Sequence, residues 1–81
     1  MSETMSVIKN FILNEFLPGE EPNALTDSTP LITGGILDSL ATLRLVSFLT
    51  ETFDVVVEPH EMGADNLDTL KDITHLVESK L

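Results

Sequence analysis

One serine in this chain, Ser39, lies where a side-chain hydroxyl group is well placed for modification. It follows the flexible pair Gly34-Gly35 and Asp38, and an apolar segment with helical spacing begins after it. A helix N-terminus presents unpaired backbone N–H groups and the positive end of the helix dipole. Because such a site favours an anion such as phosphate, Ser39 is a natural site for a phosphodiester modification.

The simpler alternative is that Asp38 and Ser39 only cap the helix. Aspartate and serine are common helix-starting residues, so the local physics alone favours this alternative. A catalytic serine is disfavoured because the chain has no G-x-S-x-G motif. His60 and His75 are the candidate bases, and no pattern places either beside Ser39. We therefore expect no catalytic residue and a protein that is not an enzyme.

Length and composition limit the remaining classes. A chain of 81 residues predicts a single domain over residues 1–81 with a modest core. Cysteine is absent, which excludes disulfides and thiol chemistry of the polypeptide. Because the chain has only two histidines, a structural zinc site is not expected either. The net charge of −10 disfavours nucleic acid and anionic membranes and suits basic partner surfaces. We expect a cytoplasmic monomer without a secretory signal or membrane span.

The elements that position Ser39 begin with a helix predicted over Ser6–Leu17, which Pro18-Gly19 ends. Ser2 and Ser6 are its candidate caps. The long connector Glu20–Asp38 is rich in residues that break helices and form turns, and such a loop is usually functional or disordered. Its apolar residues predict that it packs back onto the core; they are Leu25, Leu31, Ile32, Ile36 and Leu37.

The second helix is predicted over Ser39–Phe53, with Asp38 as its N-cap. Its apolar stripe, with Thr42 beside it, comprises Ala41, Leu45, Val46, Phe48, Leu49 and Phe53. The opposite side carries Leu40, Leu43, Arg44, Ser47, Thr50 and Glu51. This helix therefore has a core face and a second face that begins at Ser39.

The C-terminal part predicts a buried extended connector at Val55–Val57, since no other β-like run offers a partner strand. A short helical turn is predicted over His60–Asn66, and a last helix that begins near Asp68 or Thr69. The apolar stripe of the last helix comprises Leu70, Ile73, Leu76 or Val77, and Leu81. Together these elements predict an all-α bundle of three to four helices with a long first loop.

The order of these elements matches a known family. The segment Gly35-Ile36-Leu37-Asp38-Ser39-Leu40 opens a helix that ends in Glu51-Thr52-Phe53, and Pro59 and a final helix follow. In this order, and over nearly the whole chain, the sequence resembles the phosphopantetheine-dependent acyl and peptidyl carrier proteins. The Asp-Ser-Leu triplet alone is a weak signal, whereas its position and neighbours make the resemblance specific.

The resemblance implies that Ser39 receives 4′-phosphopantetheine from coenzyme A through a phosphopantetheinyl transferase. The thiol of that arm holds an acyl or aminoacyl group as a thioester, so a cysteine-free chain can still serve thioester chemistry. Asp38 matches the acidic residue that helps the transferase to recognise the serine, and Leu40 matches an apolar residue that docks against partner enzymes. The implied role is to deliver intermediates from a loading enzyme to downstream enzymes of fatty acid, polyketide or nonribosomal peptide type.

The second helix departs from the pattern of fatty-acid carriers, which place several acidic residues along it. Here Glu51 is the one acidic residue between Ser39 and Phe53. The segment from Ile36 to Val46 is more similar to free-standing carriers of specialised metabolism, including aminoacyl carriers that work with adenylating enzymes.

The predicted partner surface lies on the same helix. Leu40 and Leu43 are expected to be exposed beside Ser39, with Arg44, Ser47 and Glu51 as a polar rim. Two alternatives stay open: an acidic helical interaction module that is never modified, and a degenerate carrier that keeps the fold alone.

The remaining acidic residues predict a solvated face; they are Glu20, Glu21, Asp27, Glu58, Glu61, Asp65 and Asp68. The spacing of a calcium-binding loop is missing, so no metal site is expected, and weak binding of divalent ions to acidic clusters stays open.

Overall fold

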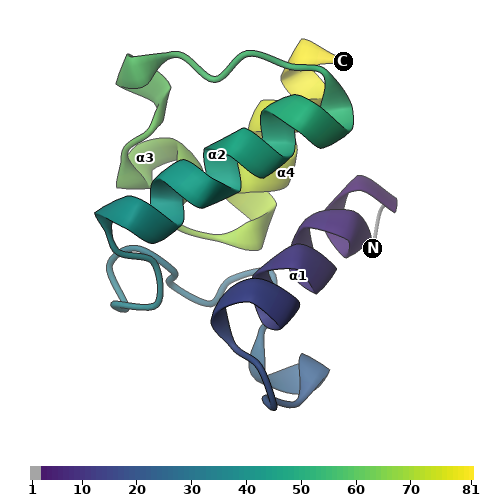
Figure 1. The fold of residues 1–81 in the computed structure, drawn as a ribbon, viewed down its shortest axis with the longest axis vertical. Helices are drawn as coiled ribbons and strands as arrows, with labels where there is room; N and C mark the ends of the chain where they lie inside the picture. Colours follow the sequence, from purple (N-terminus) through teal and green to yellow (C-terminus); the bar gives the residue numbers. More distant parts are fainter. Residues whose placement is uncertain (1–2) are drawn as a thin grey trace.

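Helices account for the regular structure of residues 3–81, the part of the chain that the computed structural model describes (Figure 1). The four α-helices are α1 Glu3–Phe16, α2 Ser39–Phe53, α3 Ala64–Leu67 and α4 Leu70–Lys80. Two 3₁₀ turns lie at Pro22–Ala24 and Pro59–Glu61. No strand occurs between residues 3 and 81, so the predicted all-α fold is confirmed.

The core lies where α1, α2 and α4 meet. In Figure 1, α2 crosses in front of α4, α1 runs along the edge of α2, and α3 lies beside the first half of α2. The contacts of α4 with α1 and α3 make it the central element. The long connector packs back as predicted, because Leu25, Leu31 and Leu37 are buried and Ile32 and Ile36 pack against the core.

Helix α1 begins at Glu3, three residues before the predicted start at Ser6. Ser6 therefore lies within the helix and is not its cap, while Ser2 lies outside the described residues. Met5, which its helical spacing with Ile8 and Ile12 predicts to lie on the apolar stripe, packs against the core. Glu3 also suits the first turn, where a negative charge meets the positive end of the helix dipole.

Helix α2 begins and ends where the sequence predicts. Its core face buries Ala41, Leu45, Val46 and Leu49. It stops at Asp54, whose backbone adopts the left-handed conformation with φ 55°. A left-handed residue commonly ends a helix because it turns the chain away from the helix axis.

Four phenylalanine rings join α1 to α2. The rings of Phe11 and Phe48 stack, with centroids 4.0 Å apart and an interplanar angle of 13°. Phe16 meets Phe11 edge to face, with centroids 5.6 Å apart, and Phe53 meets Phe48 in the same way at 6.5 Å. We call these four rings the aromatic cluster, which packs α1 against α2.

The segment after α2 is partly as predicted. Val55 and Val57 are buried, but Val56 between them is 66% exposed, because successive side chains of an extended segment point to opposite sides. The helical turn predicted over His60–Asn66 is instead a 3₁₀ turn followed by α3.

Helix α4 begins at Leu70 after the cap Thr69, whose Oγ1 accepts a hydrogen bond from the N–H of Asp72 at 3.0 Å. Both Leu76 and Val77 are buried. The prediction for Leu81 is wrong: the helix ends at Lys80, so this side chain no longer follows the buried stripe and is 70% exposed.

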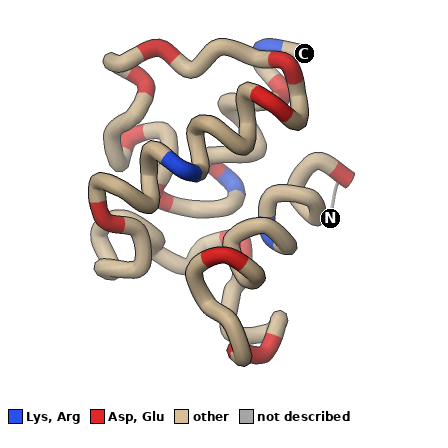
Figure 2. Tube along the Cα trace, in the orientation of Figure 1, with Lys and Arg blue, Asp and Glu red and all other residues tan. Residues whose placement is uncertain are grey.

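Acidic residues are spread over the loops and helix ends, as Figure 2 shows. For two of them the predicted solvated role is wrong. Glu61 accepts a hydrogen bond from the N–H of Glu58 and pairs with Lys80, both at 2.9 Å. Asp68 accepts hydrogen bonds from the long connector. Within residues 3–81, no helix has both the length and the apolar character needed to cross a bilayer.

Candidate functional site

Ser39 is the first residue of α2 and its side chain is exposed. The capping role belongs to Asp38, whose carboxylate accepts a hydrogen bond from the N–H of Ala41 at 2.8 Å. The backbone carbonyl of Asp38 also accepts one from Thr42 Oγ1 at 2.8 Å. The predicted N-cap is therefore confirmed. Within the described residues the hydroxyl group of Ser39 makes no hydrogen bond, so the cap does not use it.

A tight turn, Leu31–Leu37, leads the chain into Ser39. The N–H of Leu37 donates to the carbonyl oxygen of Leu31 at 2.8 Å and closes the turn. Gly34 is required because a Cβ atom there would lie 2.2 Å from the carbonyl oxygen of Pro30. Gly35 has φ +82°, a conformation that glycine adopts without strain. The glycine pair thus builds a compact turn.

A hollow of about 530 Å³ opens beside Ser39, between this turn, the start of α2 and the segment that enters α3. We call it the Ser39 hollow. Its lining is mainly apolar and comprises Ile32, Leu37, Asp38, Ser39, Thr42, Leu43, Met62, Gly63 and Ala64. A flexible group attached to Ser39 would therefore find an apolar surface next to its point of attachment.

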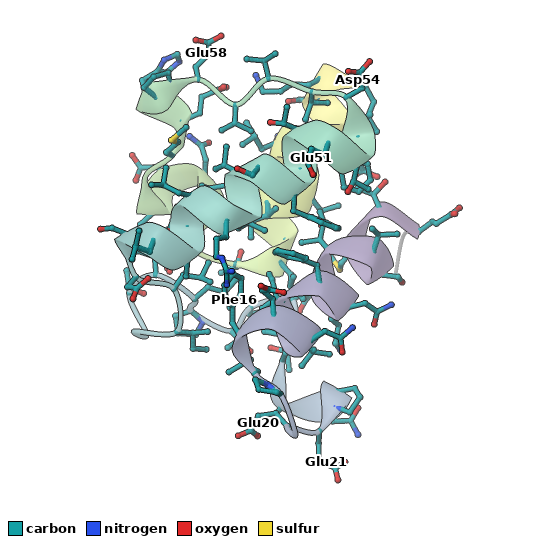
Figure 3. All side chains as sticks on the ribbon, viewed as in Figure 1. Phe16, Glu20, Glu21, Glu51, Asp54 and Glu58 are labelled. Atoms are coloured by element: carbon teal, nitrogen blue, oxygen red, sulfur yellow. The ribbon has the colours of Figure 1, made fainter. Side chains whose placement is uncertain are left out.

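A second open hollow, the α1–α2 groove, has a volume of about 650 Å³ and lies over the aromatic cluster. Phe11, Phe16 and Phe48 line it, and an ion pair between Arg44 and Glu15 bridges the two helices at 2.9 Å. In Figure 3, Glu51 lies on the outer face of α2, and Phe16 lies at the C-terminal end of α1. Glu20 and Glu21 project from the loop beyond α1.

The predicted partner residues lie together at the α1–α2 groove. Leu40 and Leu43 are 73% and 53% exposed, and Arg44, Ser47 and Glu51 are exposed as well. All of them line the α1–α2 groove.

Sequence reasoning missed the contribution of α1 to this groove, namely Glu15 and the rings of Phe11 and Phe16. Only the pairing of two helices distant in the chain brings them to α2, and the pattern within α1 carries no signal for that pairing.

Other chemistry has little support in the described residues. Neither His60 nor His75 lines the Ser39 hollow or the α1–α2 groove. Between residues 3 and 81 no group of three or more histidine, aspartate or glutamate side chains is arranged to hold a metal ion.

Comparison with known proteins identifies the family. No family-level sequence profile matches the chain. Over 73 residues, however, the chain is 34% identical to the probable acyl carrier protein PigG of Serratia sp. (strain ATCC 39006). The match covers 90% of this chain and 83% of that protein. The chain belongs to the acyl carrier protein family. The resemblance predicted from the Asp38-Ser39-Leu40 segment and the order of helices is therefore confirmed.

The charged residues around the α1–α2 groove of this acyl carrier protein are mainly acidic. Asp38, Glu51 and Glu15 line the α1–α2 groove, and Glu15 already pairs with its one cation, Arg44. The whole chain carries 14 acidic and 4 basic residues. A basic surface approaching α2 therefore meets an attractive field from both the groove and the rest of the molecule.

Proposed function

We propose that the protein carries acyl or aminoacyl groups as thioesters on a 4′-phosphopantetheine arm attached to Ser39. The observation that carries this proposal is the free, exposed hydroxyl group of Ser39 beside an Asp38 side chain that already caps α2. If serine were present only for capping, its hydroxyl would be expected to accept a backbone hydrogen bond. Membership of the acyl carrier protein family supports the same role.

The local backbone suits a phosphodiester at this position. The N–H groups of Ser39 and Leu40 have no partner within the described residues, since Asp38 receives only those of Ala41 and Thr42. These free donors and the helix dipole favour negative charge. Bound phosphopantetheine would supply a thiol on a flexible arm. The chain's own part is to present Ser39 at the surface and to provide an apolar wall through Ile32, Leu37 and Met62.

Partner enzymes are proposed to dock on α2 and on the α1–α2 groove. These partners are the phosphopantetheinyl transferase, a loading enzyme and downstream biosynthetic enzymes. An enzyme that acts at Ser39 must cover the adjoining surface, where Leu40 and Leu43 expose apolar area. Desolvation of such area favours association, while Glu51 and Glu15 attract a basic rim.

The proposed setting is specialised metabolism, in the cytoplasm, with a monomeric single carrier domain that catalyses no reaction itself. The α2 sequence supports the pathway class because Glu51 is its one acidic residue. The buried residues of α1, α2 and α4 form a continuous core, which supports a single domain.

Intact mass measurement tests the proposal directly. The purified chain is incubated with coenzyme A and a phosphopantetheinyl transferase of broad specificity. We expect the wild-type protein to gain the mass of one phosphopantetheine group and Ser39→Ala to gain none.

Ser28→Ala is the matched control, because Ser28 is an exposed serine that lines neither the Ser39 hollow nor the α1–α2 groove. This variant should gain the same mass as the wild type. If the wild type stays unmodified while a known carrier is modified in the same mixture, the proposal is wrong. An unmodified acidic interaction module or a degenerate carrier would then take its place.

A further inference from the structure

Asp68 joins the α3–α4 junction to the turn that leads into Ser39, across 36 residues of sequence. Its Oδ1 accepts hydrogen bonds from the N–H groups of Ile32 at 2.9 Å and Thr33 at 2.8 Å. Thr33 Oγ1 donates to both carboxylate oxygens, at 3.2 Å and 3.0 Å. The backbone carbonyl of Asp68 also accepts from the N–H of Leu31 at 2.6 Å. We call this set of bonds the Asp68 clamp.

The clamp is continuous with the entry to α2. Leu31, which is held by the carbonyl of Asp68, accepts in turn from the N–H of Leu37 at 2.8 Å. Ile32, which is held by the carboxylate, accepts from the N–H of Gly35 at 3.1 Å. Leu37 is separated from Ser39 only by the N-cap Asp38. The hydrogen bonds therefore run from Asp68 to the residue that precedes the helix cap.

The same turn also shapes the surface beside Ser39. Ile32 and Leu37, on the two arms of the turn, both line the Ser39 hollow. Leu37 is buried and is fixed by packing, whereas Ile32 is only half-buried. The position of Ile32 therefore depends more strongly on the hydrogen bond that its N–H donates to Asp68.

We propose that Asp68 is a positioning residue for the modification of Ser39, an inference that rests on the proposed function. It holds the turn Leu31–Leu37 in the arrangement that a transferase must meet. Without the carboxylate, the N–H groups of Ile32 and Thr33 lose their acceptor and the turn samples other conformations. An enzyme that binds only the ordered arrangement then sees a smaller binding-competent fraction, which raises its apparent KM without changing the step after binding.

The test uses kinetics of phosphopantetheine transfer with the carrier concentration varied. We expect Asp68→Ala to raise KM about fivefold while kcat changes by less than about twofold, because the competent fraction of the carrier falls. Asp68→Asn keeps one side-chain oxygen as an acceptor, so its KM should lie much closer to the wild-type value than that of Asp68→Ala. Amide hydrogen exchange at Ile32, Thr33 and Leu37 should accelerate in Asp68→Ala relative to exchange in α4.

Two matched controls separate positioning from charge and from general stability. Asp65→Ala removes the same charge from an exposed site three residues away and should leave KM unchanged. Ile73→Val weakens the buried core without touching the clamp and should lower the thermal midpoint but not raise KM. If Asp68→Ala does not fold, Thr33→Val removes the two side-chain bonds alone and should raise KM by about twofold, since it loosens only part of the clamp.

Three results bear against the inference. A folded Asp68→Ala with wild-type KM overturns it, and so does an equal rise of KM in Ile73→Val. Both outcomes leave the proposed function standing, because Ser39 is still modified. If the wild type gains no phosphopantetheine, the proposed function is wrong and the inference is wrong with it.

Discussion

Thr74 carries a hydroxyl group into the apolar core. Its side chain is buried and its Oγ1 has no hydrogen-bond partner within the described residues. A buried polar group without a partner destabilises the folded state, and valine has nearly the same shape and a similar helix propensity. We expect Thr74→Val to raise the free energy of unfolding by about 1 kcal/mol, measured by urea denaturation.

Thr42→Val is the matched control for that measurement. Thr42 Oγ1 donates a hydrogen bond to the backbone carbonyl of Asp38, so this replacement removes a bond that is made. It should lower the free energy of unfolding by about 1 kcal/mol. A loss of stability in Thr74→Val would show that its hydroxyl group has a partner after all.

Asp38 and Asp68 show how far sequence predicts the role of a single residue. The partner of Asp38 is the N–H of Ala41, three residues away, so the capping role follows from local composition. The partners of Asp68 lie at Ile32 and Thr33, and nothing in the sequence around Asp68 indicates them. The sequence therefore predicts a solvated carboxylate, which is wrong. A role that depends on the folding back of a loop stays hidden until the tertiary contacts are known.

The kinetics of phosphopantetheine transfer can test whether the transferase docks on α2 and the α1–α2 groove. Leu40→Ser and Leu43→Ser each remove exposed apolar area next to Ser39. We expect each variant to raise KM for phosphopantetheine transfer about fivefold, which corresponds to about 1 kcal/mol of lost apolar burial. The free energy of unfolding should change by less than about 0.5 kcal/mol, since both side chains are exposed in the free protein.

Leu81→Ser provides the matched control because Leu81 is 70% exposed and lies in neither hollow. Its KM should equal that of the wild type. If Leu81→Ser impairs transfer as strongly as Leu43→Ser, general surface hydrophobicity and not the groove governs docking.

The helices differ in how well the sequence predicts them. Both ends of α2 have local signals, namely a glycine pair and an aspartate cap before it and the end of its apolar stripe at Phe53. For α1 the sequence offers two candidate caps, Ser2 and Ser6, and the predicted start at Ser6 is three residues later than the observed start at Glu3. Because serine can cap a helix at either position, local composition does not decide between the two starts.

At the scale of the whole molecule, the carboxyl groups of Asp68 and Glu61 make the free energy of unfolding depend on pH in the acidic range. Hydrogen bonds from Thr33 hold the pKa of Asp68 below its ordinary value of 3.8. A hydrogen bond from Lys80 holds the pKa of Glu61 below its ordinary value of 4.5. A carboxyl group with a lowered pKa stabilises the fold above its unfolded-state pKa, and this contribution is lost as pH falls through the folded-state pKa.

The net charge of −10 acts in the opposite direction, because partial protonation of other carboxylates relieves repulsion in the compact state. We expect the urea midpoint to be highest near about pH 5 and to fall below about pH 4 as the bonded carboxylates become protonated. Measurements from neutral to acidic pH check this, with Glu61→Gln expected to show a smaller acid loss. A midpoint that continues to rise toward pH 3 would contradict the role of these two groups.

The arm proposed on Ser39 would place a thiol on a protein that otherwise has none. Since the chain has no cysteine, a sulfhydryl found in a pure sample would belong to that arm. Thiol titration against protein concentration would then report the fraction of chains whose arm is attached and carries no acyl group. A maleimide dye would label one defined place, the start of α2, without any engineered residue. The same dye would lie next to the surface proposed for docking and could report the arrival of each enzyme in turn.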